Sequence, residues 1–206
     1  METRAAYNLW AQQYDTNENK TRDLEAKALR DVLTEIAFSN CLEIGCGTGK
    51  NTEWLIGKGR VTGVDLSEEM LQKAKQKIVS DEVNFIQADI TEDWKFGNDY
   101  DLVTFSLVLE HIEDLQAIFR QVAKALKPGG HVYIGELHPF KQYSGSKARF
   151  ETEGGVQVVN CFTHHVSDFS NAAKKAGLQL MELHEYFDDD DRVGLPRVLT
   201  MLFKKT

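Results

Sequence analysis

Three glycines and two acidic residues follow three consecutive hydrophobic segments, and their spacing fits the binding of a nucleoside. Gly45, Gly47 and Gly49 alternate directly after the first segment, so the backbone can pass close to a ligand and turn into a helix. Asp65 ends the second segment, 20 residues beyond Gly45, where a carboxylate can accept hydrogen bonds from both ribose hydroxyls. Asp89 follows the third segment and can accept from the exocyclic amine of an adenine. Either acid alone could cap a loop, but the ordered set predicts a nucleoside pocket without a phosphate anchor.

The glycine pattern differs from two common phosphate-binding loops. The dinucleotide fingerprint G-x-G-x-x-G places its third glycine one residue after Gly49, where this chain has Lys50. The P-loop pattern is absent as well, because no Gly-Lys-Ser or Gly-Lys-Thr follows the glycines. A pyrophosphate cradle is therefore not favoured.

Histidines and one tyrosine are the candidates for a proton acceptor, because histidine titrates nearest neutral pH. His111 follows the fourth expected strand, where it could equally serve packing or a bound cofactor. His138 ends the fifth strand, and His131 and His184 belong to strands as structural residues. We predict that the catalytic residues are drawn from His111, His138, Tyr143 and His165.

Metal binding is a rival use of the histidines. Glu136, His138, His164 and His165 could converge on an ion, but their spacing matches no tight ligand motif. Adjacent histidines in a chain more often face opposite ways. We therefore predict no metal site.

The stretch at about 139–165 begins with a basic and aromatic segment, although the protein as a whole is acidic. Its Lys141, Lys147 and Arg149 could pair with a carboxylate or phosphate on a substrate. Residues 156–162 predict an added strand. We expect an insertion after the fifth strand that lies over the pocket and selects the substrate. The alternative is a mobile, solvated lid.

Expected strands and helices alternate along the chain. The strands are expected at 41–45, 60–66, 83–88, 100–106, 131–137, 178–187 and 198–204. Helices are expected from apolar faces at 22–36, around 54–55, and at 67–78, 112–126 and 167–176. This alternation predicts an α/β fold with a mostly parallel sheet and helices on both faces. Ligands of such sheets bind beyond the carboxyl ends of the strands, where the candidate residues lie.

Composition fits one globular domain over residues 1–206, with an N-terminal helical cap at about 1–38. Of its residues 42% are apolar and 27% charged, and no apolar run reaches the roughly 18 residues of a membrane helix. The 24 basic and 32 acidic residues give a net charge of −8, which argues against nucleic acid as a partner. The N-terminus is polar and the three cysteines are odd in number, so we expect free thiols and a cytoplasmic protein.

Five short motifs occur in one order along nearly the whole chain, from about residue 7 to residue 205. They are Leu42–Gly49, Gly63–Ser67, Ala88–Asp89, Ser106–His111 and Leu126–Gly130. This set resembles the class I S-adenosylmethionine-dependent methyltransferases, in the small-molecule branch related to ubiquinone-biosynthesis methyltransferases. The resemblance implies a Rossmann-like, seven-stranded sheet whose last strand runs antiparallel.

The resemblance also implies S-adenosyl-L-methionine as the cofactor. The residues it assigns to cofactor binding are Tyr14, Glu43, Gly45, Cys46, Gly47, Gly49, Asp65, Leu66, Met70, Asp89, Ile90, Ser106 and Leu107. The glycine loop would pass beneath the methionine part, and Glu43 would steady that loop or the cofactor amine. Asp65 would hold the ribose, and Leu66 and Met70 would lie against the adenine. Asp89 and Ile90 would frame the edge of the adenine. Ser106 and Leu107 would approach the methionine end, and Tyr14 would cover the cofactor or pack a helix.

These observations predict methyl transfer to a small-molecule acceptor by in-line attack on the sulfonium methyl group, with a general base only where the acceptor must lose a proton. The alternatives are a nicotinamide-dependent oxidoreductase and a non-catalytic S-adenosylmethionine-binding regulator. A nucleic-acid methyltransferase would usually carry an Asn-Pro-Pro-Tyr-like motif after the fourth strand, where this chain has Phe105–Val108. The sequence leaves open the acceptor atom, the pathway, and whether the protein is a monomer or a homodimer. The basic insertion suits an anionic or aromatic acceptor.

Overall fold

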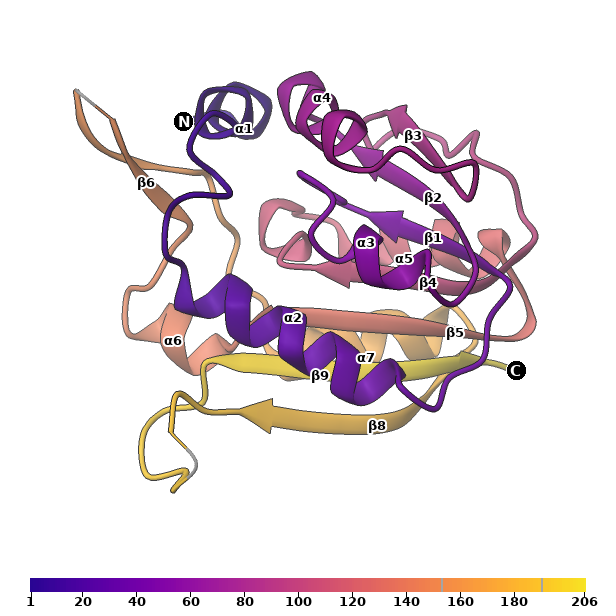
Figure 1. Cartoon of the computed structure of the whole chain (residues 1–206). Helices are drawn as coiled ribbons and strands as arrows, with labels where there is room; N and C mark the ends of the chain where they lie inside the picture. The colour runs from indigo at the N-terminus through magenta and orange to yellow at the C-terminus, as the bar shows by residue number, and fades with distance from the viewer. Residues whose placement is uncertain (153, 190) are drawn as a thin grey trace.

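The computed structural model describes residues 1–152, 154–189 and 191–206 and contains a seven-stranded sheet in the order β3-β2-β1-β4-β5-β9-β8 (Figure 1). Its strands are β1 (Asn40–Ile44), β2 (Arg60–Asp65), β3 (Val83–Gln87), β4 (Tyr100–Ser106), β5 (Leu126–Leu137), β8 (Leu178–Tyr186) and β9 (Val198–Lys205). Neighbours from β3 to β5 pair in parallel, whereas β9 pairs antiparallel with both β5 and β8. The predicted mostly parallel sheet with an antiparallel last strand is confirmed.

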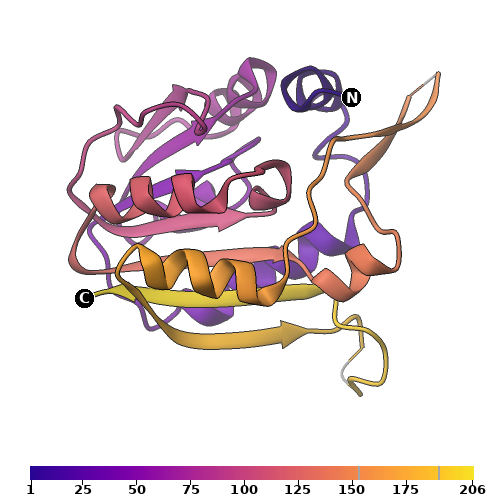
Figure 2. The same ribbon diagram turned by 180° about the vertical axis from the view of Figure 1, so that it is seen from behind.

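Helices lie on both faces of this sheet. They are α1 (Thr3–Trp10), α2 (Lys20–Leu33), α3 (Thr52–Leu55), α4 (Glu68–Lys77), the 3₁₀ turn η1 (Leu109–His111), α5 (Leu115–Ala125), α6 (Pro139–Tyr143) and α7 (Val166–Lys175). In Figure 1, α2 and α3 lie in front of the sheet, and Figure 2 shows α5 and α7 on the opposite face. Each face has its own core, because successive residues of a strand such as Cys41 and Leu42 point to opposite sides.

Local signals in the sequence begin and end several of these elements. Ser67 caps α4, since its hydroxyl oxygen accepts a hydrogen bond from the Met70 N–H at 3.2 Å. Asp114 caps α5 in the same way through the Ala117 N–H at 3.0 Å. Gly177 follows α7 with a φ of +77°, a conformation that favours glycine.

Two strands differ from the prediction. Strand β5 begins at Leu126 rather than at 131, because Leu126 pairs with Tyr100 before a bulge shifts the register to His131 and Leu102. The strand expected at 156–162 ends earlier, at Val158. Beyond it the backbone bonds to other elements instead of a ladder, for example through the Phe162 N–H to the Glu110 carbonyl at 2.7 Å.

The segment between β5 and α7 contains α6 and a separate antiparallel pair, β6 (Arg149–Thr152) and β7 (Gly155–Val158). Figure 1 shows this ribbon beside α1, away from the main sheet. The Phe150 ring stacks on Trp10 of α1 with centroids 5.0 Å apart and planes inclined by 13°. The start of the chain and this segment therefore meet over the carboxyl ends of the strands.

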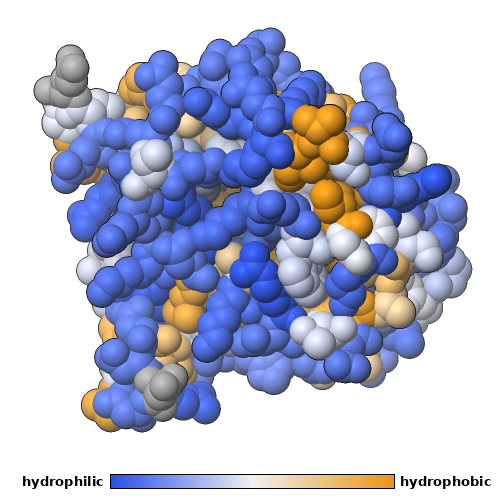
Figure 3. Space-filling view, viewed as in Figure 1, coloured by the Kyte–Doolittle hydropathy of each residue, from blue (hydrophilic) through white to orange (hydrophobic). Residues whose placement is uncertain are grey.

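Polar side chains dominate the face in front of the sheet, as Figure 3 shows, and apolar groups there are small and scattered. Among the described residues, no helix combines the length and apolar character needed to cross a membrane.

Candidate functional site

A cavity of about 220 Å³ lies beyond the carboxyl ends of β1, β2 and β4 and is covered by the start of α1. Eleven of the predicted site residues line it: Tyr14, Gly45, Gly47, Asp65, Leu66, Met70, Asp89, Ile90, Ser106, Leu107 and His111. The cavity is also lined by residues that sequence reasoning did not assign, which include Glu2, Thr3, Arg4 and Tyr7 of the N-terminal segment. We call it the first cavity.

The glycine loop turns sharply under the first cavity. The N–H groups of Gly45 and Cys46 both donate to the Val64 carbonyl, at 2.7 and 3.1 Å, and all three glycines have a positive φ between 54° and 82°. A β-carbon on Gly45 would lie 2.2 Å from Cγ2 of Val108, whereas one on Gly47 would meet nothing within 4 Å. Gly45 is therefore required by packing, and Gly47 leaves its space to the cavity.

Asp65 joins the first two strand ends. Its Oδ2 accepts a hydrogen bond from the Gly47 N–H at 2.8 Å, and its Oδ1 accepts from the Ser67 N–H at 2.8 Å. Burial raises the pKa of this carboxyl group, and the backbone N–H donors oppose that rise. The carboxylate is thereby held in one orientation at the wall of the first cavity.

Three predicted cofactor-binding residues lie behind the cavity wall and not on it. Glu43 is buried and accepts a hydrogen bond from the Thr52 hydroxyl, and burial raises its pKa to about 8. The Cys46 thiol is buried, which raises its pKa well above the usual value. Gly49 packs against the end of α4, because a β-carbon there would lie 3.4 Å from Ala74 and 2.8 Å from Ile78, the residue that follows the helix. These residues support the loop from the side of the core.

The turn after β4 forms another wall of the first cavity. Leu107 has a φ of +59°, which is uncommon for a residue with a side chain, and its N–H donates to the Gly135 carbonyl at 2.8 Å. Oε1 of Glu136 accepts from the N–H groups of Val108 and Leu109, at 3.0 and 2.8 Å. Burial raises the pKa of Glu136 to about 8. A buried carboxyl group thus fixes the turn that presents Leu107.

A second cavity, of about 350 Å³, adjoins the first and shares three residues with it: Tyr7, Tyr14 and Leu107. It lies between α1, α2 and the segment that joins β5 to α7. Five cationic side chains line it, Lys20, Arg22, Lys147, Arg149 and Arg197, together with the acidic Glu18 and Glu110. Arg197 is paired with Asp188, and Arg22 donates to the backbone carbonyls of Tyr14 and Asn17. Lys141 instead lies 3.8 Å from Asp188 and does not line the cavity.

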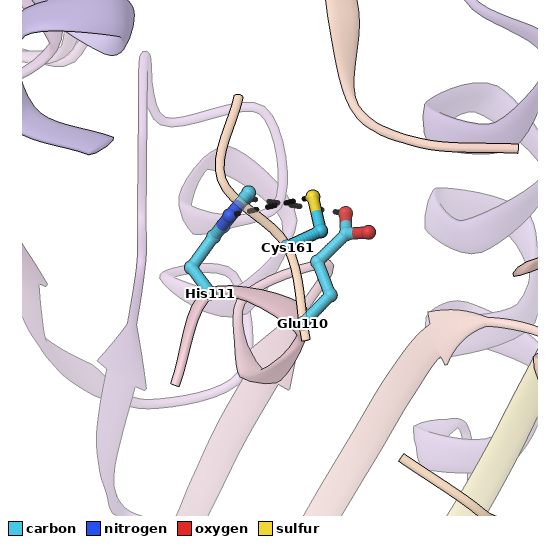
Figure 4. Close-up of side chains that lie close together, drawn as sticks. All are labelled: Glu110, His111 and Cys161. Atoms are coloured by element: carbon cyan, nitrogen blue, oxygen red, sulfur yellow. Dashed lines mark hydrogen bonds and ion pairs between the residues drawn. The ribbon is translucent and has the colours of Figure 1, made fainter. Parts of the chain in front are cut away.

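His111 is held on both of its ring nitrogens. Its Nε2 lies 2.9 Å from the Tyr7 hydroxyl, and its Nδ1 lies 2.9 Å from the carbonyl oxygen of Asn160. Figure 4 shows that His111 also faces Glu110 and Cys161, which lie 4.0 and 3.8 Å from its nitrogens. These three side chains are of metal-ligand types, but both ring nitrogens of His111 already bond to other groups, Nε2 to Tyr7 and Nδ1 to Asn160.

The other catalytic candidates line neither of these two cavities in the part of the chain that the structure describes. His138 is 1% exposed and caps α6, with its Nδ1 accepting from the Phe140 N–H and its Nε2 beside Glu185. Tyr143 and His165 bond to each other at 2.6 Å on the surface of the insertion. His164 bonds to the Ile112 carbonyl at 2.7 Å. Of the predicted proton acceptors, the structure brings only His111 to the first cavity.

Comparison with known proteins agrees with this geometry. Residues 42–134 match a family described as a methyltransferase domain. A ubiquinone biosynthesis O-methyltransferase from Marinobacter nauticus is 30% identical over 74% of this chain and 69% of its own length. The chain belongs to this methyltransferase family. The predicted family, its enzyme class and its cofactor, S-adenosyl-L-methionine, are confirmed.

Two further comparisons define the extent of the likeness. A ubiquinone biosynthesis O-methyltransferase from Escherichia fergusonii is 34% identical to this chain. The match covers 66% of this chain and 58% of that relative's length. The crystal structure of the N-methyltransferase NodS from Bradyrhizobium japonicum with S-adenosyl-L-homocysteine has a TM-score of 0.69 and 21% identity, covering 97% of this chain and 98% of the other. That structure supports the fold of the whole methyltransferase.

Tyr7 is the most informative residue that the sequence reasoning missed, because it lines both cavities of the methyltransferase. A signal for it was present: Tyr7, Trp10 and Tyr14 recur at intervals of three and four residues, which places aromatic rings on one side of the N-terminal segment. Their rings are in contact, with centroids 5.1 to 6.3 Å apart.

Proposed function

We propose that this methyltransferase binds S-adenosyl-L-methionine in the first cavity and a small anionic acceptor in the second. The observation that carries this proposal is the shared wall of the two cavities, formed by Tyr7, Tyr14 and Leu107. A methyl group held in the first cavity beside these residues would lie next to the second cavity, where the acceptor could reach it directly. The chain's own contribution is then alignment of the two reactants and exclusion of water.

The lining of the first cavity fits the parts of the cofactor. The Asp65 carboxylate would accept hydrogen bonds from the ribose hydroxyls, and Asp89 would accept from the adenine amine beside Ile90. Leu66 and Met70 would lie against the adenine ring. The backbone of the glycine loop, with Ser106 and Leu107 opposite, would hold the methionine part, and Glu43, Cys46 and Gly49 would support that loop from behind. Tyr14, which also lines the first cavity, would cover the bound cofactor. When bound, the cofactor supplies a methyl group on a positively charged sulfur.

The lining of the second cavity favours an acceptor with a carboxylate or phosphate group. Lys147 and Arg149 come from the insertion, and Lys20 comes from the start of α2. Such a cluster of cations in a protein of net charge −8 would attract and orient a small anion. Tyr7, Trp10 and Tyr14 also line this cavity, and their aromatic rings suit a flat acceptor. The curated relatives are named O-methyltransferases, and a phenolic acid combines all of these properties.

His111 is the proton acceptor that we propose for such a phenol. It lies at the first cavity and is oriented by the Asn160 carbonyl, as a general base must be oriented to act at one atom. We assign structural roles to the other candidates: His138 caps α6, and Tyr143 bonds to His165 at the start of α7.

Two experiments test this function. Calorimetric titration should show S-adenosyl-L-homocysteine binding in the micromolar range and no binding of NADH; NADH binding alone would contradict the proposal. Release of S-adenosyl-L-homocysteine should then be measured with 3,4-dihydroxybenzoate and with uncharged catechol as acceptors. We expect kcat/KM to be at least about tenfold higher for the carboxylate, the effect of one charged hydrogen bond. Equal values for the two acceptors would contradict an anion site.

The double variant Lys147→Ala/Arg149→Ala should remove this preference by raising KM for the carboxylate only. The matched control is Lys174→Ala/Lys175→Ala, which removes the same charge from exposed positions on α7, on the other side of the sheet. A preference lost equally in both variants would mean that net charge, and not the second cavity, attracts the acceptor.

A further inference from the structure

We propose that Tyr7 and His111 act together as the proton acceptor, with the Tyr7 hydroxyl relaying the acceptor's proton to Nε2 of His111. We infer further that this pair is complete only while the N-terminal segment is docked on the insertion. This inference rests on the proposed function, which uses the ring of Tyr7 but gives no role to its hydroxyl group.

The hydrogen bonds of His111 define which nitrogen can take a proton. The carbonyl oxygen of Asn160 can only accept, so Nδ1 of the neutral ring, 2.9 Å away, carries the hydrogen. Nε2 is then an acceptor, and the Tyr7 hydroxyl donates to it at 2.9 Å. The two rings meet edge to face, with centroids 5.4 Å apart and planes inclined by 80°. Tyrosine, base and orienting carbonyl form the arrangement by which a weakly acidic group is activated.

The position of Tyr7 gives it access that His111 lacks. Tyr7 lines both cavities, whereas His111 lines only the first. Burial, and then the neighbours Tyr14, Glu110, Cys161 and Asp65, raise the pKa of the Tyr7 phenol well above its usual value. The hydroxyl therefore stays protonated and can pass a proton on, but does not act as a free phenolate.

The proton transfers and the methyl transfer together account for every bond that forms and breaks. As the acceptor oxygen forms its bond to the methyl carbon and the carbon–sulfur bond breaks, the acceptor's proton moves to the Tyr7 oxygen. The proton of Tyr7 moves to Nε2 at the same time, so Tyr7 ends unchanged and His111 ends as an imidazolium ion. This ion then returns its proton to water, and no oxidant or further reactant is needed.

The same residues connect the relay to docking of the N-terminus. Asn160, whose carbonyl orients His111, also donates its N–H to the Met1 carbonyl at 3.1 Å, and the Met1 amino group donates to the Val158 carbonyl at 3.0 Å. Trp10, one turn beyond Tyr7, stacks on Phe150 of β6. The contacts that place Tyr7 on His111 are thus the contacts that close the N-terminal segment over both cavities.

The first test replaces single hydroxyl groups. In Tyr7→Phe the ring and its packing stay, and we expect kcat with 3,4-dihydroxybenzoate to fall by about 10²-fold, at the lower end of general-base effects. The Kd of S-adenosyl-L-homocysteine should change by less than about twofold. The matched control is Tyr143→Phe, which breaks the other tyrosine–histidine pair, outside both cavities, and should leave kcat unchanged. A kcat in Tyr7→Phe within twofold of the wild type would overturn the relay.

A second test needs no acceptor, so it separates failure of the relay from failure of the proposed acceptor class. Long-range proton–nitrogen NMR of the full chain should show His111 with its proton on Nδ1 and with Nε2 accepting a hydrogen bond, and Tyr7→Phe should remove only the latter. A proton on Nε2 in the wild type would contradict the relay even if methyl transfer is observed.

The variant Phe150→Ala tests whether the relay depends on docking of the N-terminal segment. We expect the decrease in kcat caused by Phe150→Ala not to add to the decrease caused by Tyr7→Phe when the two are combined in a double variant. Additive decreases would refute the coupling.

Discussion

Oδ2 of Asp65 accepts a hydrogen bond from the N–H of Gly47 at 2.8 Å, so the carboxylate at the end of β2 holds the loop that follows β1. Its other oxygen accepts from Ser67, the residue that caps α4. One side chain therefore connects the glycine loop, the second strand and the fourth helix at the wall of the first cavity. Loss of its charge would affect both the shape of the loop and the contacts offered to a ribose.

We expect Asp65→Asn to weaken binding of S-adenosyl-L-homocysteine by at least about tenfold, because an amide cannot accept on both sides as a carboxylate does, and hydrogen bonds to charged groups contribute about 1.5–3 kcal/mol each. Asp65→Ala should weaken it further. Calorimetric titration measures both, and thermal unfolding monitors the fold. Affinity within twofold of the wild type in Asp65→Asn would show that the ribose is held elsewhere.

The two glycines should respond differently to a methyl group. In Gly45→Ala the β-carbon would overlap Val108 at 2.2 Å in addition to the strain of a positive φ, so we expect a loss of about 2–5 kcal/mol in the free energy of unfolding. In Gly47→Ala only the strain remains, about 1–2 kcal/mol, but the methyl group enters the cavity and should weaken cofactor binding. Urea unfolding and titration with S-adenosyl-L-homocysteine separate the two effects. Equal destabilisation of the two variants would contradict the packing argument.

Much of the lining of the first cavity could be predicted from sequence because it is encoded locally. The run from Glu43 to Gly49 is contiguous, and the rule that parallel strands end at one edge brings Asp65 and Asp89 to it without further information. What the motif could not show is which residues face the cavity. Glu43 and Cys46 belong to the same run, yet both are buried behind the loop.

The proposed proton relay depends on contacts between distant segments and could not be read in the same way. Tyr7 is 104 positions from His111, and His111 is 49 positions from Asn160, so no spacing rule connects them. His138 illustrates the opposite error: its place after β5 suggested the cavity rim. Pro139 at the first position of α6 instead marks His138 as the cap of that helix, with its ring turned into the protein.

The buried carboxyl group of Glu43 should make stability depend on pH. Its pKa is raised from 4.5 to about 8 in the folded protein, so the folded state holds a proton that the unfolded state has released. The stabilisation is present below pH 4.5 and is lost as the pH rises through about 8, at up to about 1.4 kcal/mol per pH unit. Glu43→Gln keeps an acceptor for the Thr52 hydroxyl but cannot ionise, so its stability relative to the wild type should increase between pH 6 and pH 9.

Urea unfolding at several pH values measures this difference for Glu43→Gln. Glu136, whose pKa is raised to about 8, gives a slope of the same sign in both proteins. The charge of Glu25, whose pKa is raised to about 7, contributes to the raised pKa of Glu43, so the comparison reports Glu43 together with its coupling to Glu25. A difference between variant and wild type that stays constant with pH would mean that Glu43 is ionised in the folded state.

Methyl transfer should not depend on a metal ion at Glu110, His111 and Cys161, although these side chains lie within 4.8 Å of one another (Figure 4). An ion could bind there only if His111 gave up its bond to Tyr7 or to Asn160. Prolonged dialysis against EDTA should therefore leave kcat unchanged, and so should Cys161→Ser, because the thiol lies 3.8 Å from an Nδ1 that already donates to a carbonyl. Activity that is lost on chelation, regained with Zn²⁺ and absent in Cys161→Ser would place a metal where we propose a proton relay. Added Zn²⁺ is in contrast expected to inhibit, since it would compete with Tyr7 for the imidazole.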